Sequence, residues 1–353
     1  MAVPTVTDEW VIESVSSPGS PALRLNKSVP VEAIGNDEVL LEIKAVSLNY
    51  RDLAIASGGY PLPVKFPLIP TSDGSGVVLA VGASVTSLSV GDAVCVLPAP
   101  LHVSGHLTTA THRTLGDGDL SGLLRRHVVL PASWVARFPD YLTFVEASTL
   151  GAAGVTAWNI LFGSGPRGIR AGDWVLTQGT GATAMFAAGF AVLSGATVVG
   201  TTSSDAKAQW LTELGVSKVL NYREDPTWGE TARKLSPNGE GVDLVVDVGG
   251  SGTLAQSLKA IRYDGTVAVT GFLTGGEGGP GPSLIEVLPR AANVRGILGG
   301  SRAQYEEMVG MMKQWKFHPT VDKRVFGFED AKEAYEYLRA QKHVGKVVIE
   351  IRR

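Results

Sequence analysis

A strand, a glycine-rich turn, a helix and a second strand follow one another between residues 174 and 200. The first strand, 174–178, is short and apolar, as is typical of a buried strand in a parallel sheet. The turn after it runs from Gly179 to Ala184 with the pattern G-x-G-x-x-A, and an apolar helix follows. The second strand covers 196–200. This stretch constrains the fold most, because its order of elements predicts an α/β unit built on a parallel sheet.

The chemistry of the turn indicates what such a unit binds. Gly179 permits a tight turn, Gly181 has no side chain to block a pyrophosphate, and Ala184 is small enough for close helix–strand packing. Free N–H groups at the helix N-terminus face the anion. We therefore predict a doubly wound Rossmann domain for a dinucleotide; the alternative is a structural glycine turn in another α/β domain. The predicted contacts in the turn are Gly179, Thr180, Gly181, Ala182 and Thr183.

The end of the second strand indicates which dinucleotide binds. Folds that bind NAD usually place an acidic residue there, about 20 residues after the glycines, to hold the ribose 2′-hydroxyl. This chain instead continues through two threonines to Ser203 and Ser204, and Lys207 follows. Hydroxyl donors and a cation suit a 2′-phosphate, so we predict NADPH in preference to NADH, with Tyr222 beside the adenosine. Asp205 is expected to cap the next helix, and the alternative for Lys207 is ordinary solvated surface charge.

Composition and charge bound the remaining possibilities. At 353 residues the chain is long enough for two domains, and its net charge of −3 argues against a nucleic-acid or anionic-membrane partner. Its one cysteine, Cys95, excludes an intrachain disulfide and fits a reducing, cytoplasmic compartment. No run of about 18 apolar residues occurs, so no membrane span is expected. A small-molecule substrate is the expected partner.

The pattern of elements changes along the chain. The first 135 residues are rich in short strands separated by turns, whereas strands and helices alternate from residue 174 onward. A glycine-rich stretch, 275–281, is expected to form a mobile loop beside the strand ends. Thr143 is the expected N-cap of a helix that runs to Leu161. The other expected strands are 39–46, 76–81, 93–97, 127–130, 217–220, 242–248, 266–271 and 347–351, and the other expected helices are 185–193, 254–261, 303–315 and 328–341.

Several short motifs, taken together, make this sequence similar to one superfamily over nearly its whole length. They are Leu48-Asn49-Tyr50-Arg51-Asp52, Gly58-Gly59-Tyr60-Pro61, Ser72-Asp73-Gly74-Ser75-Gly76, Val90-Gly91-Asp92, Gln178-Gly179-Thr180-Gly181, Asn221-Tyr222-Arg223, Asp247-Val248-Gly249-Gly250 and His343-Val344-Gly345-Lys346-Val347-Val348. The chain resembles the medium-chain dehydrogenase/reductase superfamily, in its quinone-oxidoreductase-like branch. That branch includes members called zinc-type alcohol dehydrogenase-like.

This resemblance implies an architecture. A GroES-like, β-rich partial barrel is expected from residues 1–137, completed by 298–353, and the Rossmann domain, 138–297, is expected between these segments. The active site is expected in the cleft, and the molecule is expected to be a homodimer. Further residues that the resemblance places at the nicotinamide, the rest of the cofactor or a partner subunit are Gly271, Phe272, Leu273 and Lys346.

Zinc-containing members of the superfamily hold their catalytic metal with a Cys, a His and a second Cys, and this chain differs at each matching position. Asn49 stands for the first Cys, Ser72 stands for the His, and 150–153 contain no ligand type. Catalytic zinc needs three protein ligands of the Cys, His or carboxylate type, so we predict a site without zinc. The histidines of the polar loop 101–121 are expected on the surface, because their spacing is irregular. They are His102, His106 and His112.

Without a metal to acidify an alcohol, reduction of an activated C=C bond is the easier reaction. Hydride from NADPH reaches the β-carbon of an enone or quinone, and a donor must meet the charge on the carbonyl oxygen. Tyr60 is the first candidate, since metal-free enoyl reductases of the superfamily carry a functional tyrosine there; the alternative is that it packs in a turn before Pro61. Asn49 is the second, orienting the nicotinamide or the substrate; the alternative is a turn-forming asparagine.

Three further side chains are expected at the substrate pocket. Tyr50 and Phe272 are expected to border it, and Asp73 is expected to transfer a proton or, alternatively, to anchor a neighbouring backbone or Arg. The predicted function is NADPH-dependent, zinc-independent reduction of an activated C=C bond in a small apolar substrate. Three alternatives stay open: a metal-free alcohol or ketone oxidoreductase with the same cofactor, an NADPH-binding regulatory or structural protein with little turnover, and, as a minor option, a redox-neutral synthase that has repurposed the fold.

Overall fold

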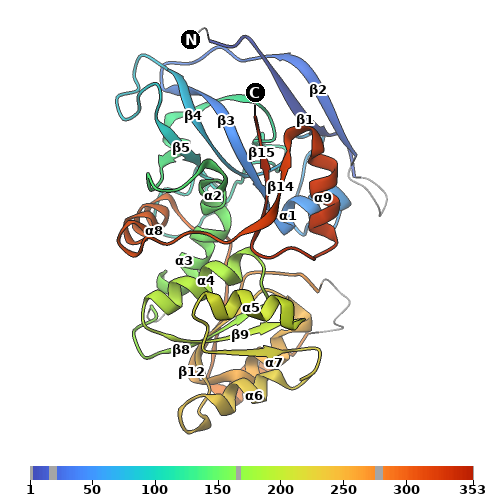
Figure 1. The fold of residues 1–353 in the computed structure, drawn as a ribbon, viewed down its shortest axis with the longest axis vertical. Coiled ribbons are helices and arrows are strands. Elements are labelled where there is room, and N and C mark those ends of the chain that lie inside the picture. Colours follow the sequence, from blue (N-terminus) through green and yellow to red (C-terminus); the bar gives the residue numbers. More distant parts are fainter. Residues whose placement is uncertain (1–2, 16–21, 164–167, 275–280, 353) are drawn as a thin grey trace. The chain divides into compact units, whose positions relative to one another are not determined.

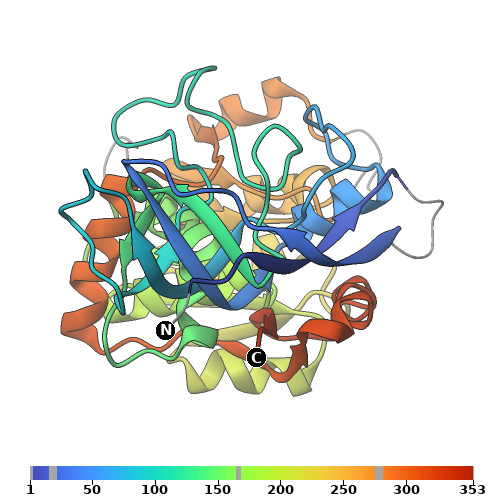
Figure 2. The ribbon, with the colours of Figure 1, turned by 90° about the horizontal axis from the view of Figure 1, so that it is seen from above.

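The computed structural model describes residues 3–15, 22–163, 168–274 and 281–352 (Figure 1). Its chain divides into two units. The first unit is Met1–Val155 with Gly300–Arg353, and the second unit is Thr156–Gly299. Both ends of the described chain therefore belong to the first unit (Figure 2).

The boundaries of the two units differ from those expected after residues 137 and 297. The structure places 138–155 in the first unit. Within this segment, helix α2 (Phe144–Ala147) packs against strands β3 (Glu38–Leu48) and β4 (Asp73–Val81). The segment therefore belongs to the β-rich unit rather than to the unit with the parallel sheet.

The first unit is built on a seven-stranded sheet in the order β14-β15-β3-β4-β5-β7, with β6 pairing with β3. Its neighbouring strands are antiparallel except for β14 and β15, which are parallel. Strands β1 and β2 form a separate antiparallel pair. This is the β-rich, GroES-like part that the sequence predicts. The remaining bounds in this unit are β1 (Val6–Ile12), β2 (Leu23–Pro30), β5 (Ala93–Val96), β6 (His127–Pro131), β7 (Val135–Arg137), β14 (Val321–Gly327), β15 (Lys346–Glu350), α1 (Tyr50–Ser57), α8 (Arg302–Trp315) and α9 (Ala331–Arg339).

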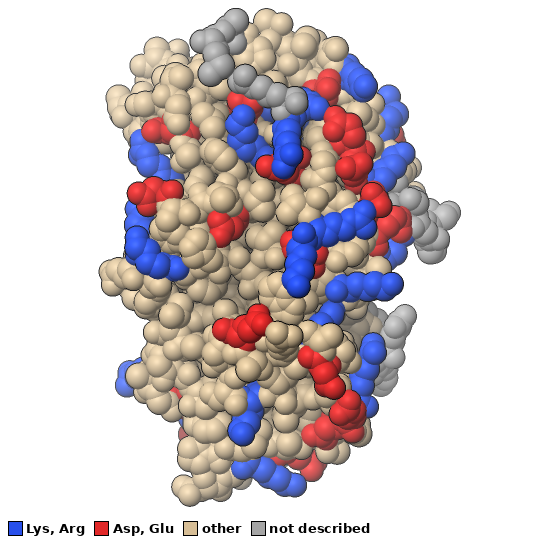
Figure 3. Space-filling model, viewed as in Figure 1, with Lys and Arg blue, Asp and Glu red and all other residues tan. Residues whose placement is uncertain are grey.

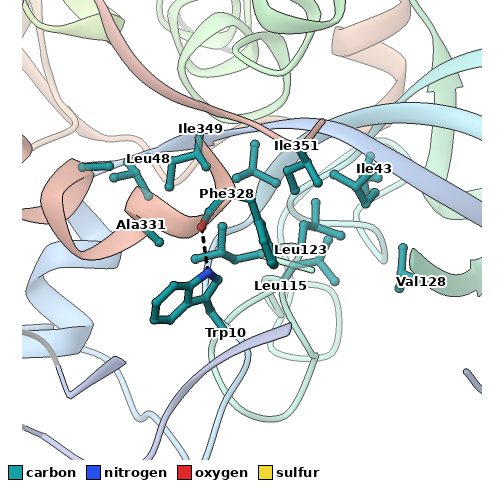
Figure 4. Close-up of a cluster of buried hydrophobic side chains, with 14 of the residues drawn as sticks. Trp10, Ile43, Leu48, Leu115, Leu123, Val128, Phe328, Ala331, Ile349 and Ile351 are labelled. Carbon is teal, nitrogen blue, oxygen red and sulfur yellow. Dashed lines mark hydrogen bonds between the residues drawn. The ribbon is translucent and has the colours of Figure 1, made fainter. Parts of the chain in front are cut away.

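Apolar side chains from both ends of the chain fill the core of the first unit (Figure 4). Trp10 and Ile43 come from the N-terminal strands, and Phe328 and Ile349 come from the last 30 residues; all four are buried. The indole N–H of Trp10 donates to the carbonyl oxygen of Phe328 at 2.9 Å, so the only polar group of this ring is satisfied. Burying each such side chain stabilises the fold by about 1.5–3 kcal/mol.

The second unit is a six-stranded, all-parallel sheet in the order β10-β9-β8-β11-β12-β13. Numbered from β8, this is the 3-2-1-4-5-6 order of dinucleotide-binding folds, so the predicted Rossmann domain is confirmed. The order reverses between β8 and β11, and ligands of such sheets bind outside the carboxyl ends of the strands at this point. The bounds are β8 (Trp174–Gln178), β9 (Thr197–Thr202), β10 (Lys218–Asn221), β11 (Val242–Asp247), β12 (Ile261–Val269), β13 (Asn293–Gly296), α3 (Val155–Phe162), α4 (Ala182–Leu193), α5 (Asp205–Glu213), α6 (Trp228–Leu235) and α7 (Leu254–Ala260).

Several expected elements differ in detail. The helix expected from 144 to 161 is interrupted by a π-helical turn, η2 (Leu150–Gly154). Strand β12 begins at Ile261, earlier than expected, because its pairing with β11 shifts register where Asp264 takes a positive φ of 57°. Ser204, with extended backbone, is the N-cap of α5, so the expectation that Asp205 caps this helix is wrong; its carboxylate lies in the first turn.

The sequence analysis did not predict some strands, and one predicted loop lies mostly outside the described residues. The sequence did not predict β1, β2, β7, β13 or β14. Most of the loop expected at 275–281 lies outside the described residues. Among the residues that are described, no helix combines the length and the apolar character that crossing a membrane requires. Figure 3 shows positive and negative side chains interspersed over the face it presents.

Candidate active site

The glycine turn of the second unit is open on its outer side. Gly179 has a φ of +75°, which favours glycine, and Gly181 is the N-cap of α4. A Cβ atom added to either glycine would meet no heavy atom within 4 Å, and Gly181 has no side chain to cap the first N–H groups of the helix. The N–H of Gly179 donates to the carbonyl oxygen of Thr201 at 2.8 Å, which ties the turn to β9. Open space and free donors fit the pyrophosphate of a dinucleotide.

The residues predicted to contact the 2′-phosphate and the adenosine lie at the carboxyl ends of β9 and β10. Ser203 and Ser204 follow β9 directly, and Lys207 lies in the first turn of α5. The N–H of Tyr222, after β10, donates to the carbonyl oxygen of Thr202 at 3.0 Å. Tyr222 is 42% exposed, so a ligand can cover it. The structure therefore brings all four predicted residues to one edge of the sheet.

A buried polar network, which the sequence analysis missed, joins the ends of β8 and β11. The amide nitrogen of Gln178 donates to Ser257 Oγ at 2.8 Å and to the Asp247 carboxylate at 3.2 Å. Ser257 Oγ donates to the same carboxylate at 2.6 Å, and Gln178 Oε1 accepts the N–H of Val248 at 3.1 Å. The network fixes the two strands that flank the reversal of strand order. Its signal in the sequence is the acidic residue that ends a very apolar strand, one residue before a pair of glycines.

The segment after β12 lies across the end of β11. Leu273 donates its N–H to the carbonyl oxygen of Val248 at 3.3 Å. A Cβ atom on Gly271 would come within 2.1 Å of that oxygen, so only glycine fits there. Phe272 is half-buried, and Leu273 is exposed. The three residues predicted at the nicotinamide therefore lie at the same carboxyl-end edge as the glycine turn.

In the first unit, three residues that are distant in sequence meet in a polar cluster, defined here as Asn49, Asp73 and Lys346. The Lys346 ammonium donates to Asn49 Oδ1 at 2.7 Å and to Asp73 Oδ2 at 3.1 Å. Asn49 Nδ2 donates to Asp73 Oδ2 at 2.9 Å. The side chains of Lys346 and Asp73 are 1% and 0% exposed, whereas Asn49 is half-buried. The structure thus places Lys346 in the interior of this unit, with its charge compensated by Asp73.

Asp73 also anchors the π-helical turn η2. Its Oδ1 accepts the N–H of Ala152 at 2.7 Å. A Cβ atom on Gly151 would lie only 2.8 Å from the same oxygen and 2.7 Å from Pro98, so glycine is required for this approach. Ser47 Oγ lies 3.4 Å from Oδ2. Both carboxylate oxygens are therefore engaged, in the anchoring arrangement that was the alternative to proton transfer.

The donors at the matching zinc positions do not fit a catalytic zinc ion. Asn49 offers an amide, Ser72 a hydroxyl, and η2 only small side chains, while the neighbouring Asp73 is already paired with Lys346. A divalent ion at the cluster would lie beside the ammonium, which like-charge repulsion disfavours. Over the described part of the chain, no group of three or more His, Cys, Asp or Glu side chains is placed to hold a metal.

The histidines of the loop 101–121 are not all on the surface. His102 is buried, and its Nε2 lies 3.1 Å from the carbonyl oxygen of Gly105, so the expectation of an exposed position is wrong for this residue. His106 is exposed and His112 is half-buried.

Arg51 and Asp52, in the first turn of α1, form a local ion pair. The Arg51 guanidinium lies 3.6 Å from Asp52 Oδ1, and Asp52 Oδ2 accepts the N–H of Asn49 at 2.8 Å. Burial raises the pKa of Asp52, and the attraction of Arg51 offsets this only in part. Burial lowers the pKa of Arg51, but the charge of Asp52 and other acidic neighbours outweigh it, so this pKa is raised. Asp52 is thus a buried cap of α1.

Arg51 also reaches Tyr60, the first candidate donor. The guanidinium hydrogen-bonds the Tyr60 side chain, and its Cζ lies 5.3 Å from the centroid of the ring. The same guanidinium donates to the carbonyl oxygen of Leu115 at 2.9 Å and to Thr114 Oγ1 at 3.1 Å. Tyr60 and Tyr50 are half-buried against the core of the first unit. Sequence analysis missed this role of Arg51, because the contact joins a helix to two separate loops.

Comparisons with known proteins match both units. The alcohol dehydrogenase GroES-like domain matches residues 35–140, and the zinc-binding dehydrogenase family matches residues 182–314. A zinc-type alcohol dehydrogenase-like protein from Schizosaccharomyces pombe is 42% identical over 317 residues, covering 89% of this chain and 91% of the relative. Prostaglandin reductase-3 from Mus musculus is 28% identical over 371 residues, covering 99% and 91%.

A solved structure agrees over the full length. A candidate alcohol dehydrogenase from Sinorhizobium meliloti 1021 superimposes with a TM-score of 0.89 at 36% identity, covering 99% of this chain and 100% of its own. The fold is that of NAD(P)-dependent dehydrogenases, and the relatives are named as dehydrogenases and reductases. The chain therefore belongs to the medium-chain dehydrogenase/reductase superfamily and is an alcohol dehydrogenase-like oxidoreductase.

Proposed function

We propose that this oxidoreductase reduces an activated C=C bond, in an enone, an enoyl compound or a quinone, with NADPH and without a metal. The observation that carries the proposal is the polar cluster, in which Asn49 is bound to Lys346 and Asp73 where zinc members have a metal ligand. Oxidising an alcohol requires a strong acidifying group, whereas hydride addition to a polarised C=C bond requires only a donor at the carbonyl oxygen. The mouse relative named as a reductase supports this reading.

NADPH is proposed over NADH. When bound, the cofactor supplies the hydride. The open turn at Gly179 and Gly181 suits its pyrophosphate. Ser203, Ser204 and Lys207 suit a 2′-phosphate, because β9 ends in hydroxyl-bearing residues rather than in a carboxylate.

Tyr60 is proposed as the donor to the carbonyl oxygen. Arg51 has hydrogen-bond donors only, so the phenol oxygen accepts the bond between them. A phenol can accept and donate at once, so accepting this bond does not remove its capacity to donate. As hydride adds to the β-carbon, negative charge develops on the carbonyl oxygen, and this O–H stabilises it. The α-carbon takes its proton from a side chain or from water.

The test is NADPH oxidation over a panel of enones, quinones and ketones, combined with elemental analysis of the protein. We expect turnover of enones or quinones, a preference for NADPH, and no stoichiometric transition metal. Tyr60→Phe should lower kcat on the order of 10²-fold while the Kd for NADPH is unchanged, since one donor to the oxyanion is lost. Tyr337→Phe, which removes a phenol bound to Asp322 in the same unit, is the matched control and should retain activity.

The other outcomes of this screen separate the alternatives. Ketone turnover without enone turnover would indicate a metal-free alcohol or ketone oxidoreductase, a function that the name of the Schizosaccharomyces relative favours. Tight NADPH binding without any oxidation would indicate a regulatory or structural protein. A stoichiometric metal that is needed for turnover would overturn the metal-free proposal.

We also propose a homodimer. Strand β13 is at the edge of the parallel sheet of the second unit, so one side of its backbone is not paired within the sheet. Three apolar side chains precede it on the surface: Leu284, Ile285 and Leu288 are 90%, 67% and 70% exposed. An unpaired edge beside an apolar patch favours pairing with a second copy. Light scattering coupled to size exclusion measures the mass directly.

A further inference from the structure

The geometry points to Lys346 and Asp73 as positioning residues that fix the Asn49 side chain as a hydrogen-bond donor with one free N–H. This inference rests on the proposed function, in which negative charge develops on the substrate carbonyl oxygen, and it makes Asn49 a second donor to that oxygen in addition to Tyr60. The proposed reaction does not by itself require this second donor. Tyr60 alone would suffice for the chemistry, but the buried ion pair behind Asn49 would then have no use in the site.

The orientation of the Asn49 amide follows from donor and acceptor chemistry. Lys346 has donors only, so the group that faces it at 2.7 Å is the amide oxygen. The Asp73 carboxylate accepts, so the group that faces it at 2.9 Å is the amide nitrogen. Flipping the amide would place its NH₂ against an ammonium and its oxygen against a carboxylate. Only one orientation is therefore compatible with these two neighbours.

One donor is left after these bonds are counted. The amide nitrogen carries two hydrogens, and Asp73 takes one of them. The two partners are completely buried, whereas Asn49 itself is half-buried. The second N–H is therefore the polar hydrogen that this cluster presents to a ligand. A carbonyl oxygen that gains negative charge is the acceptor that suits it.

The ammonium also strengthens this donor. A cation on the amide oxygen draws electron density from the nitrogen, and hydrogen bonds in series polarise one another where the dielectric constant is low. The charge of Lys346 thus acts on the substrate through the amide. A buried ion pair is weak evidence for a contribution to stability, so stability alone does not account for this arrangement.

The orientation can be tested without any turnover. In protein labelled with ¹⁵N-asparagine, Asn49→Asp identifies the Asn49 side-chain signals. We expect its two N–H hydrogens to differ: one should exchange with water on the order of tenfold slower than the other, because a bond to a carboxylate protects it. Equal exchange of the two hydrogens would overturn the inference even if the enzyme reduces enones.

The kinetic test uses Lys346→Met, Lys346→Arg and a control. Lys346→Met should lower kcat for an enone on the order of tenfold or more with little change in KM or in NADPH affinity, and Lys346→Arg should recover part of this loss. Lys44→Met is the matched control, because Lys44 pairs with the buried Glu42 at 2.7 Å on the same sheet; it should retain kcat.

The outcomes are distinguishable. If wild-type protein reduces no enone, the proposed function fails, and the exchange measurement still decides the orientation. If wild-type protein is active and Lys346→Met retains its kcat, the positioning role is overturned. If Lys346→Met does not fold, Lys346→Arg and the wild-type exchange rates carry the test. Equal loss of kcat in Lys44→Met would show that the effect is only structural.

Discussion

Among the single residues of the site, the decisive property is whether a side chain can donate or only accept. Arg51 and Lys346 donate only, and each is bound to a side chain that can do both. Accepting these bonds leaves both Tyr60 and Asn49 able to donate as well. In the proposed mechanism, Arg51 and Lys346 orient the two side chains that donate to the substrate.

Lys207 provides the first prediction for a single residue. Lys207→Glu should weaken NADPH binding on the order of tenfold more than NADH binding, because it places like charge near the 2′-phosphate. Fluorescence titration with both cofactors measures the two Kd values. Lys218→Glu is the control, since Lys218 is exposed at the opposite, amino end of β10. An equal loss of affinity for both cofactors would show that Lys207 does not contact the 2′-phosphate.

Asp52 provides the second prediction for a single residue, because its pKa is raised. The folded protein holds the proton of this carboxyl more tightly than the unfolded chain does, so this contribution to stability is present below the ordinary pKa of 3.8 and is lost as pH rises through the folded-state pKa. Asp52→Asn keeps an acceptor for the N–H of Asn49 but does not titrate. Its free energy of unfolding should therefore improve relative to wild type as pH rises, measured by urea denaturation; a constant difference would contradict this.

Helices and strands place these residues through a few close approaches. At Gly151 and Gly271 the backbone lies so close to neighbouring atoms that a Cβ atom would clash with them. Beside Gly179, in contrast, the space is open. Gly181 differs from Gly151, because the space beside it is empty of protein. Glycines such as Gly151 are needed for the close packing of the fold, whereas Gly181 leaves space that a ligand can fill.

Gly181→Ala tests this difference. Because the added methyl meets no protein atom, the free energy of unfolding should change by less than about 1 kcal/mol, while NADPH affinity should fall on the order of tenfold or more. Gly310→Ala is the control: Gly310 is exposed inside α8, its Cβ would also meet open space, and it should stabilise by about 0.5–1 kcal/mol without affecting NADPH. Unchanged cofactor binding in Gly181→Ala would remove this turn from the cofactor site.

The elements that could be predicted are those with strong local signals. Strand β8, the glycine turn and α4 form a periodic unit with its own turn chemistry, and the sequence predicts them closely. Short strands such as β7 and β13 have only three and four residues, too few for a clear pattern. The contacts of Lys346 depend on pairing between β15 and β3, which are about 300 residues apart, and no local pattern encodes that.

Charge and apolar surface together characterise the outside of the molecule. Figure 3 shows positive and negative side chains interspersed on its face, and several form pairs such as Arg324 with Glu333 at 2.6 Å. Such exposed pairs contribute little to stability, about 0–1 kcal/mol each. The exposed side chains that precede β13 are apolar instead of charged. The proposed dimer depends on this apolar patch.

Leu288→Glu tests that dimer. A charge in the apolar patch before β13 should shift the protein from dimer to monomer, because burying an unpaired carboxylate in an interface is costly. Light scattering coupled to size exclusion, over a range of concentrations, measures the shift. Val90→Glu is the control, since Val90 is an apolar side chain 64% exposed on the first unit. A monomeric wild type, or a dimer that tolerates Leu288→Glu, would contradict the proposal.

The position of β15 in the sheet has a consequence for how the chain is made. This strand is inserted between β14 and β3, so the sheet begun by the first 155 residues is completed only by residues that are synthesised after the whole second unit. The intervening Rossmann segment emerges in full before that happens. A nascent chain halted before residue 346 would contain every residue of the glycine turn and yet leave Asp73 without the ammonium of Lys346. Competence to bind nucleotide and competence for chemistry would then arise at different moments of translation.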